Sequence, residues 1–446
     1  MKIIREHSQL SSVFPAYYSS LPIDRLKLSQ YTEANHVDDN NIVLYSYVTD
    51  AIILLTQCEY ESLSNMDFSE NTEFFESLRE NGFFVDVCVD ELELMCKQRE
   101  NMSSNVSQMM KVVIMPTTDC NARCRYCIGS SNKRIKMTLD TARQVVNYIV
   151  ERAANYKSIR FDWYGGEPLM ESDVITYICE EVNKRLPDKA YSSVITTNLA
   201  LFDENLLKKA VDIWHIKKVN VTIDGTEQEH NARKNYLNRT LNGYRHTLEC
   251  IRILLDNDIN VFCRFNIDRN NEGELPRVLD ELQQFNGHNL FYFFVSPLRG
   301  SDCHSEFYAT SEYNELFFKT GELMHEKGFK NAIDSFVPKV ALGFCVAKNK
   351  NCFVVGPTGE LFRCNLDDLD QETATGNVVE GLDKNAAYNT FIDLKLDERC
   401  TTCRYLPICQ GGCPTEKKFQ SSSNDQCLKF KFKTNAISKL LVDYYC

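Results

Sequence analysis

The stretch TTDCNARCRYC, residues 117–127, carries Cys120, Cys124 and Cys127 within eight residues and decides how this chain is interpreted. It follows the apolar run 112–115. A buried free cysteine behaves as a small hydrophobic residue and has no reason for regular spacing. Thiolate ligands on one short loop, by contrast, converge on one point. The spacing therefore predicts a metal centre with one position left open.

Composition sets the broad class of the protein. The chain has 446 residues, of which 43% are hydrophobic, and a net charge of -12, which predicts a globular protein without a nucleic-acid partner. No apolar run is as long as a membrane span, and the start MKIIREHSQL lacks the apolar core of a secretory signal. We therefore expect a cytoplasmic protein with no membrane partner. Its nineteen cysteines then stay reduced and suit iron or zinc better than disulfides.

Short apolar runs alternate with helical stretches through the middle of the chain. Thr138 is a plausible N-cap for the first helix. The alternation predicts parallel α/β architecture, either an open doubly wound sheet or a partial barrel. The expected strands are 111–117, 158–164, 192–198, 218–224, 260–267 and 289–296, and later helices are expected at 203–213, 243–256 and 273–285.

Polar motifs follow four of these strands. The cysteine trio follows the first, YGGEP (164–168) the second, TTN (196–198) the third and IDG (223–225) the fourth. Each motif alone is compatible with a turn or a helix cap. Because the carboxyl ends of parallel strands meet at one rim, the four together favour a ligand site there.

The C-x3-C-x2-C spacing, Tyr126 before the last cysteine and the GGEP motif resemble the radical S-adenosylmethionine (SAM) superfamily over roughly residues 111–297. The resemblance implies a partial (β/α)6 TIM-type barrel. It also implies that Cys120, Cys124 and Cys127 hold a 4Fe-4S cluster whose fourth iron binds SAM. The implied reaction is reductive cleavage of SAM to a 5'-deoxyadenosyl radical, which takes a hydrogen atom from the substrate.

The same resemblance assigns the SAM contacts. Tyr126 approaches the adenine, largely through its backbone, and Gly165, Gly166 and Glu167 lie where family members meet the methionine amino group. Thr197, Asn198, Thr222 and Asp224 lie near the ribose, and Arg264 and Asn266 resemble the R-x-N that lines the SAM pocket. The usual T-N-G is here Thr197-Asn198-Leu199, a departure from the family pattern.

A second group of cysteines lies near the C-terminus. CTTC (400–403) alone looks like a zinc knuckle, so zinc competes in this region. The full spacing, together with Gly359-x4-Cys364, resembles the SPASM domain, which implies two fully ligated auxiliary 4Fe-4S clusters and hence three clusters in all. By resemblance the first auxiliary cluster takes Cys345, Cys352, Cys364 and Cys413, and the second takes Cys400, Cys403, Cys409 and Cys427.

The first hundred residues contain strand-like runs around a Thr49-Asp50 turn and a helix that Gly82 ends. They predict a small α+β, winged-helix-like domain. This weakly resembles the domain that binds leader peptides by adding a strand to its sheet, and a packing cap is the alternative. The expected division is a recognition domain (1–105), a radical SAM core (106–300), a bridging region (301–344) and a SPASM domain (345–446).

SPASM proteins act mostly on polypeptides, so the expected substrate is a ribosomally made precursor peptide with a leader, and the first expectation is a thioether crosslink. The electron donor would be a flavodoxin or a ferredoxin. Carbon-carbon crosslinking, epimerisation and sulfatase maturation stay open, although Asn365 stands where sulfatase-maturing relatives typically carry aspartate. A simple iron-sulfur electron carrier would need neither the open three-cysteine motif nor the GGEP rim.

Overall fold

A sheet of eight strands forms the centre of this computed structural model, in the order β12-β11-β10-β9-β8-β7-β13-β14. All neighbours are parallel except β14, which is antiparallel to β13. The strands are β7 (Met109–Thr117), β8 (Ser158–Gly165), β9 (Ala190–Thr196), β10 (Ile216–Ile223), β11 (Asn260–Ile267), β12 (Phe291–Pro297), β13 (Cys352–Val355) and β14 (Leu361–Phe362). The described residues are 1–6, 14–18, 22–67, 72–104, 109–131, 133–298, 310–329, 337, 339–340, 345–366, 369–370, 372–393, 395–415 and 434–445.

The six expected strands are present, and they lie side by side in sequence order. A doubly wound sheet reverses its strand order at a switch point. The order found here has no such reversal, so the partial-barrel alternative is confirmed. Strands β13 and β14, from the C-terminal region, extend the sheet beyond β7 and were not expected from the sequence.

Helices cover one face of this sheet, onto which alternate residues of each strand project. Val112, Phe161, Val219 and Val261 are buried on that face in one large core. The sequence prediction that Thr138 caps the first helix is confirmed, since its side chain accepts from the Thr141 amide at 3.1 Å. The helices of this layer are α4 (Leu139–Ala153), α5 (Ser172–Arg185), α6 (Glu204–Asp212), α7 (Glu227–Lys234), α8 (Gly243–Asp256) and α9 (Leu275–Asn286).

A separate antiparallel sheet, ordered β1-β5-β4-β3, forms at the N-terminus. The expected turn at Asp50 joins β4 to β5, and Gly82 follows α2 with φ +72°. The elements of this part are β1 (Lys2–Arg5), β2 (Leu26–Leu28), β3 (Thr32–His36), β4 (Ile42–Ser46), β5 (Ile52–Leu55), α1 (Gln57–Asn65), α2 (Thr72–Glu80), β6 (Phe84–Asp86) and α3 (Glu91–Ser104).

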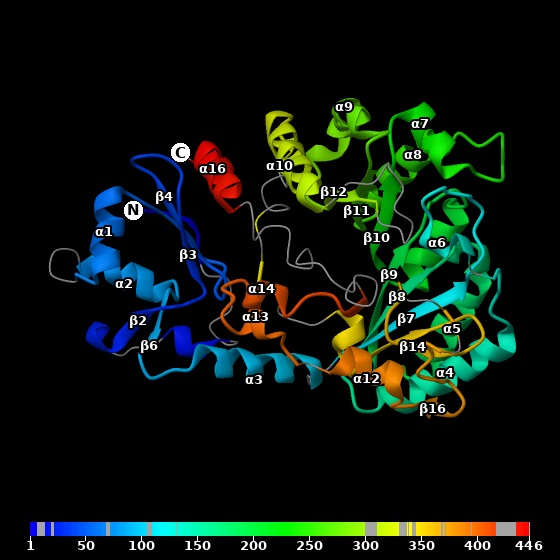
Figure 1. Cartoon of the computed structure of the whole chain (residues 1–446). Coiled ribbons are helices and arrows are strands. Elements are labelled where there is room, and N and C mark those ends of the chain that lie inside the picture. Colours follow the sequence, from blue (N-terminus) through cyan, green and yellow to red (C-terminus); the bar gives the residue numbers. More distant parts are fainter. Residues whose placement is uncertain are drawn as a thin grey trace.

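The N-terminal sheet shares a core with the C-terminal part of the chain. Tyr45 and Tyr47 pack in one cluster with Leu406 and Leu441. In Figure 1, α3 runs below α13 and α14 from the N-terminal sheet toward the central sheet, and α16 lies beside β3 and β4. The remaining helices and strands are α10 (Thr310–Glu326), β15 (Gly376–Asn377), β16 (Gly381–Leu382), α12 (Ala386–Ile392), α13 (Glu398–Thr401), α14 (Leu406–Cys409) and α16 (Thr434–Tyr445).

Among the described residues, no helix combines the length and the apolar composition that crossing a bilayer requires.

Candidate active site

The loop with the cysteine trio leaves the sheet at the end of β7 and is held by main-chain hydrogen bonds. The Arg123 amide donates to the Lys234 carbonyl at 3.0 Å, and the Leu237 amide donates to the Asn121 carbonyl at 2.8 Å. These bonds fix the loop against the C-terminal end of α7. Cys120 and Cys124 are half-buried and Cys127 is exposed.

The three thiols lie close enough to influence one another. Burial, with smaller contributions from the Glu167 carboxylate, Cys124 and Cys127, raises the pKa of the Cys120 thiol to about 12. Burial likewise raises the pKa of Cys124, against the opposing charge of Lys234. Thiols in this setting ionise when a cation replaces their protons, as metal binding does.

The GGEP turn crosses directly over the cysteine loop. The Gly166 amide donates to the Thr117 carbonyl at 2.9 Å, and the Glu167 amide donates to the Asp119 carbonyl at 2.8 Å. A Cβ on Gly166 would lie 2.0 Å from the Asp119 oxygen, and Gly165 has φ +117°. Both positions therefore require glycine, because two backbones meet here.

Glu167 is 1% exposed, and its carboxylate joins two strand ends. It accepts from the Thr197 hydroxyl at 2.7 Å and from the Asn198 amide at 2.8 Å. Burial raises the pKa of Glu167, although these hydrogen bonds oppose the shift. Asn198 in turn donates to the Asn121 side chain at 2.7 Å, which ties the end of β9 to the cysteine loop.

Leu199, where the family pattern has glycine, keeps a left-handed backbone with φ +61°. Its side chain is fully buried in the main core. Burial of the leucine side chain offsets the cost of a conformation that favours glycine.

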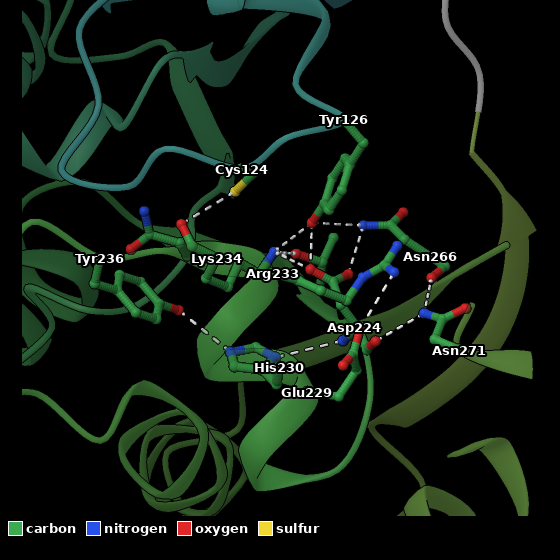
Figure 2. A network of polar contacts seen from close by, with 12 residues as sticks. Cys124, Tyr126, Asp224, Glu229, His230, Arg233, Lys234, Tyr236, Asn266 and Asn271 are labelled. Carbon is green, nitrogen blue, oxygen red and sulfur yellow. Dashed lines mark hydrogen bonds and ion pairs between the residues drawn. The ribbon is translucent and has the colours of Figure 1, made fainter. Parts of the chain in front are cut away.

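The remaining rim residues converge on Asp224, which is 0% exposed. Its carboxylate accepts from the Tyr126 hydroxyl, from Asn266 Nδ2 at 2.8 Å and from Lys234 Nζ at 3.0 Å (Figure 2). Lys234 also donates to Thr222 Oγ1 and to the Tyr126 hydroxyl. Four predicted residues, Thr222, Asp224, Tyr126 and Asn266, thus meet around one lysine that the sequence argument missed.

This group carries a charged pair despite its burial. Burial alone would raise the pKa of Asp224, but Lys234, His230 and the bond from Tyr126 outweigh it, so the pKa lies below the ordinary value. The pKa of Lys234 lies well above its ordinary value because Asp224 and Tyr126 outweigh the burial that would lower it. Both residues are therefore charged at neutral pH.

A ring of supporting residues surrounds the pair. Asn271 Nδ2 donates to the Asp224 carbonyl at 2.7 Å (Figure 2). Arg233 Nη2 donates to Asp268 Oδ2 at 2.6 Å. His230 Nδ1 accepts from the Asp224 amide at 3.4 Å. Burial lowers the pKa of His230 to about 3, with a further contribution from the Lys234 charge, so this imidazole is neutral.

Most of the missed residues lie on α7, a helix that the sequence argument did not expect. His230 and Lys234 are four residues apart and face the site together. In this polar segment, that spacing is the signal in the sequence that indicates a helix. Arg264, by contrast, is exposed on β11, and no hydrogen bond joins it to this network in the described part of the chain. Burial raises the pKa of Tyr164, the Arg264 charge opposes this shift, and Cys127 and Cys364 add to it.

The C-terminal cysteines lie on several short elements. Cys345 precedes the short helix η6 (Val346–Lys348), buried Cys352 begins β13, and Cys364 Sγ accepts from the Thr415 hydroxyl at 3.3 Å. Cys413 is exposed two residues before Thr415. Cys400 and Cys403 raise the pKa of Cys409, which burial already raises. Cys427 lies outside the described residues.

The donor chemistry fits iron-sulfur clusters, whose usual protein ligands are cysteine thiolates. In the described part of the chain, no group of three or more His, Cys, Asp or Glu side chains is arranged to hold a metal ion. In a 4Fe-4S cube each thiolate binds a different iron, so the sulfur atoms need not converge on one atom. Loops rich in thiols suit such a group.

Comparisons with known proteins agree with this geometry. Residues 114–282 match the model of the radical SAM superfamily. The radical SAM cyclopropyl synthase TigE of Paramaledivibacter caminithermalis is 22% identical over 457 residues, which cover 88% of this chain and 91% of that protein. The cysteine-type anaerobic sulfatase-maturating enzyme of Clostridium novyi is 24% identical over 371 residues, which cover 74% and 96%.

Two solved structures share the fold. Native anSMEcpe with bound AdoMet superposes with a TM-score of 0.60 at 17% identity, covering 75% of this chain and 99% of that one. SuiB of Streptococcus suis bound to S-adenosylmethionine gives a TM-score of 0.53 at 14% identity, covering 90% and 100%. With a family model that matches residues 114–282, relatives along most of its length and a cysteine loop at the rim of a partial barrel, this chain contains a radical SAM domain.

Proposed function

We propose that this enzyme modifies a ribosomally synthesised precursor peptide and installs a thioether crosslink. The observation that carries the proposal is similarity along most of the chain to radical SAM enzymes, joined to a C-terminal region rich in cysteines. Among the solved structures that share the fold, one is described as SuiB bound to the precursor peptide SuiA. A peptide substrate accounts for a chain much longer than its SAM core.

Different residues of the rim would bind the cluster and SAM. Cys120, Cys124 and Cys127 would hold the SAM-binding cluster, and the Lys234-Asp224 pair would present one fixed positive and one fixed negative charge to SAM. Together, cluster and SAM supply a radical that takes a hydrogen atom from an unactivated carbon. Glu167 and the two glycines would keep the loop in place while this happens.

Formation of a thioether leaves one electron to remove. The substrate carbon loses a hydrogen atom to the 5'-deoxyadenosyl radical, giving 5'-deoxyadenosine, and the substrate thiol loses a proton. As the carbon-sulfur bond forms, one electron must leave the peptide, and the auxiliary cluster assigned to Cys345, Cys352, Cys364 and Cys413 would accept it. Cys127 and Cys364 both contribute to the raised pKa of Tyr164, which supports a short path between the SAM-binding cluster and this auxiliary cluster. A flavodoxin or a ferredoxin would supply the first electron.

Residues 1–105 would recognise the leader. The four-stranded sheet of this part ends in two outer strands, β1 and β3, and an extended peptide pairs with an open sheet edge. Hydrogen bonds from the main chain then provide affinity that depends little on the leader sequence.

Carbon-carbon bond formation is the second candidate, because a relative covering 88% of the chain is named a cyclopropyl synthase. Both products lose two hydrogens, so mass alone does not separate them. Sulfatase maturation is supported by the Clostridium novyi relative but opposed by Asn365.

Mass spectrometry of the cognate peptide, encoded near the gene for this chain, tests the proposal. The expected product has lost two hydrogens and has one thiol that no longer reacts with an alkylating agent. Loss of two hydrogens with every thiol still reactive would establish the carbon-carbon alternative. An unchanged mass with an inverted residue would establish epimerisation.

A variant with alanine at Cys120, Cys124 and Cys127 is the control. It should form no 5'-deoxyadenosine, and turnover by this variant would refute the assignment of the SAM-binding cluster.

A further inference from the structure

A buried guanidinium lies among the cysteines of the C-terminal region. Arg363 directly follows β14 and is 1% exposed. Its Nε donates to the Ala347 carbonyl at 3.1 Å, and its Nη1 donates to the Cys352 carbonyl at 2.6 Å. Its Nη2 donates to the carbonyls of Val346 at 3.1 Å, Ala347 at 3.0 Å and Asn349.

These bonds give the N–H groups of Arg363 their acceptors, but they do not neutralise its positive charge. Every acceptor is a main-chain carbonyl, and no ion pair joins Arg363 to a carboxylate of the described residues. The ring of Tyr388 lies 5.3 Å from the guanidinium carbon and gives only a weak attraction. A charge buried in this way is costly unless a negative group lies beside it.

The candidates for that negative group are the thiols of this region. Arg363 bonds to the carbonyl of Cys352, precedes Cys364 in sequence, and clasps residues 346–349, which directly follow Cys345. Burial lowers the pKa of Arg363, and Cys352 and Cys345 are among the groups that oppose this shift. A cube held by four thiolates carries net negative charge, whereas the same thiols in protonated form carry none.

We propose that Arg363 is the countercation of the first auxiliary cluster. Its positive charge raises the reduction potential of the cluster by favouring the more negative, reduced form. The inference rests on the assignment of Cys345, Cys352, Cys364 and Cys413 under the proposed function. It adds a residue that sets how readily this cluster accepts the electron from the substrate.

The alternative is that Arg363 is only a backbone clip. A clip acts through its hydrogen bonds, and lysine, with a compact ammonium, cannot reproduce five bonds from a planar fork. A countercation acts through charge, which lysine keeps. Comparison of Arg363→Lys with Arg363→Gln therefore separates the two roles.

The experiment uses the full chain, reconstituted with iron and sulfide under anaerobic conditions. Iron content is measured first, and the potential of each cluster is then followed by a redox titration with electron paramagnetic resonance. Addition of SAM identifies the SAM-binding cluster by its change of spectrum. Arg143→Gln is the control, because Arg143 is 61% exposed and pairs with Asp140 on the surface of α4.

The expected result is a lower potential for one auxiliary cluster in Arg363→Gln, with the SAM-binding cluster unchanged. Arg363→Lys and Arg143→Gln should both stay near the wild-type values. Full iron content with an unchanged potential in Arg363→Gln would overturn the proposal. About four irons in the wild type, instead of about twelve, would overturn the auxiliary-cluster assignment itself.

Loss of a cluster is also informative. If Arg363→Gln retains about eight irons while Arg363→Lys retains about twelve, the charge is needed for assembly and the proposal holds. If both variants lose the same iron, Arg363 is only a backbone clip and the proposal fails.

Discussion

At the scale of single residues, the rim depends on a few contacts that tolerate no substitute. The Lys234-Asp224 pair is one of them, since Lys234 is 4% exposed and its ammonium has three partners. Breaking a buried pair leaves a charge with no counterpart, which costs more than the pair itself contributes.

We expect Lys234→Met to destabilise the fold by about 3 kcal/mol and to weaken SAM binding. The reason is that Asp224 keeps its burial but loses its cation. Thermal unfolding and equilibrium binding of SAM measure the two effects. Lys217→Met, on an exposed side chain of β10, is the control and should change neither. Unaltered SAM affinity in folded Lys234→Met would contradict a role for the pair in binding.

Gly166→Ala should displace the cysteine loop. The new Cβ would lie 2.0 Å from the Asp119 oxygen and 2.8 Å from the Thr118 carbonyl carbon, so one of the two backbones must move. We expect a loss of about 2 kcal/mol or more in stability, together with reduced iron at the SAM-binding cluster. Gly287→Ala, with nothing within 4 Å, is the matched control and should keep its iron.

His230 predicts a pH dependence of stability. Its pKa is lowered to about 3 in the folded chain by burial and by Lys234, against about 6.5 in an unfolded chain. The unfolded state therefore binds the extra proton first as pH falls. This contribution is fully present above about pH 6.5 and is lost at up to about 1.4 kcal/mol per pH unit down to about pH 3.

Urea denaturation at several pH values checks this prediction. Wild type should lose more stability below pH 6.5 than His230→Gln does, because glutamine does not titrate. Parallel pH profiles of the two proteins would show that His230 does not contribute in this way.

At the scale of elements, α3 is the joint between the N-terminal sheet and the cysteine-rich region. At its first residue, buried Glu91 accepts from the Tyr17 hydroxyl at 2.9 Å, the Ser29 hydroxyl at 2.6 Å and the Gln30 amide at 3.0 Å. Farther along, Arg99 Nη2 donates to the Gln410 carbonyl at 3.3 Å. One helix thus contacts both parts, and Figure 1 shows α3 running beneath them.

Glu91→Ala should loosen this joint. Two buried hydroxyl groups and the partly buried Gln30 amide would lose their acceptor, which predicts a loss of about 3 kcal/mol in the free energy of unfolding. Glu93→Ala, whose partner Lys97 is 66% exposed, is the control and should cost less than about 1 kcal/mol. Chemical denaturation measures both, and equal costs would show that the buried contacts of Glu91 are unimportant.

At the scale of the whole molecule, the N-terminal sheet does not stand apart. Tyr45 and Tyr47 share a core with Leu406, Ile437 and Leu441, so a leader bound to this sheet would lie next to the second cysteine group. The architecture provides a physical route by which leader binding acts on the cysteine-rich region.

Deletion of residues 1–105 should therefore lower the thermal unfolding midpoint of the remaining chain as well as weaken leader binding. The exposed apolar surface around Leu406 and Leu441 is the reason. Calorimetry compares the truncated and full chains, and iron content shows whether the truncated protein keeps its SAM-binding cluster. An unchanged midpoint would mean that the shared core contributes nothing to stability.

The sequence by itself determined the local features. Short apolar runs indicated six strands, and the spacing of three cysteines after the first of them indicated the family. Both signals are local, so the linear sequence contains them. The same logic located Gly166 and Asp224, because motifs that follow parallel strands gather at one rim.

Tertiary structure alone decided the partners of those residues. Lys234 reaches Asp224 because α7 folds back over the rim, and β13 joins β7 because a segment more than two hundred residues later adds to the sheet edge. The linear sequence does not show that the Arg363 guanidinium is buried among the carbonyls of residues 346–352; only the fold brings them together. Burial and charge depend on what packs from elsewhere in the chain, and the linear sequence does not contain that neighbourhood.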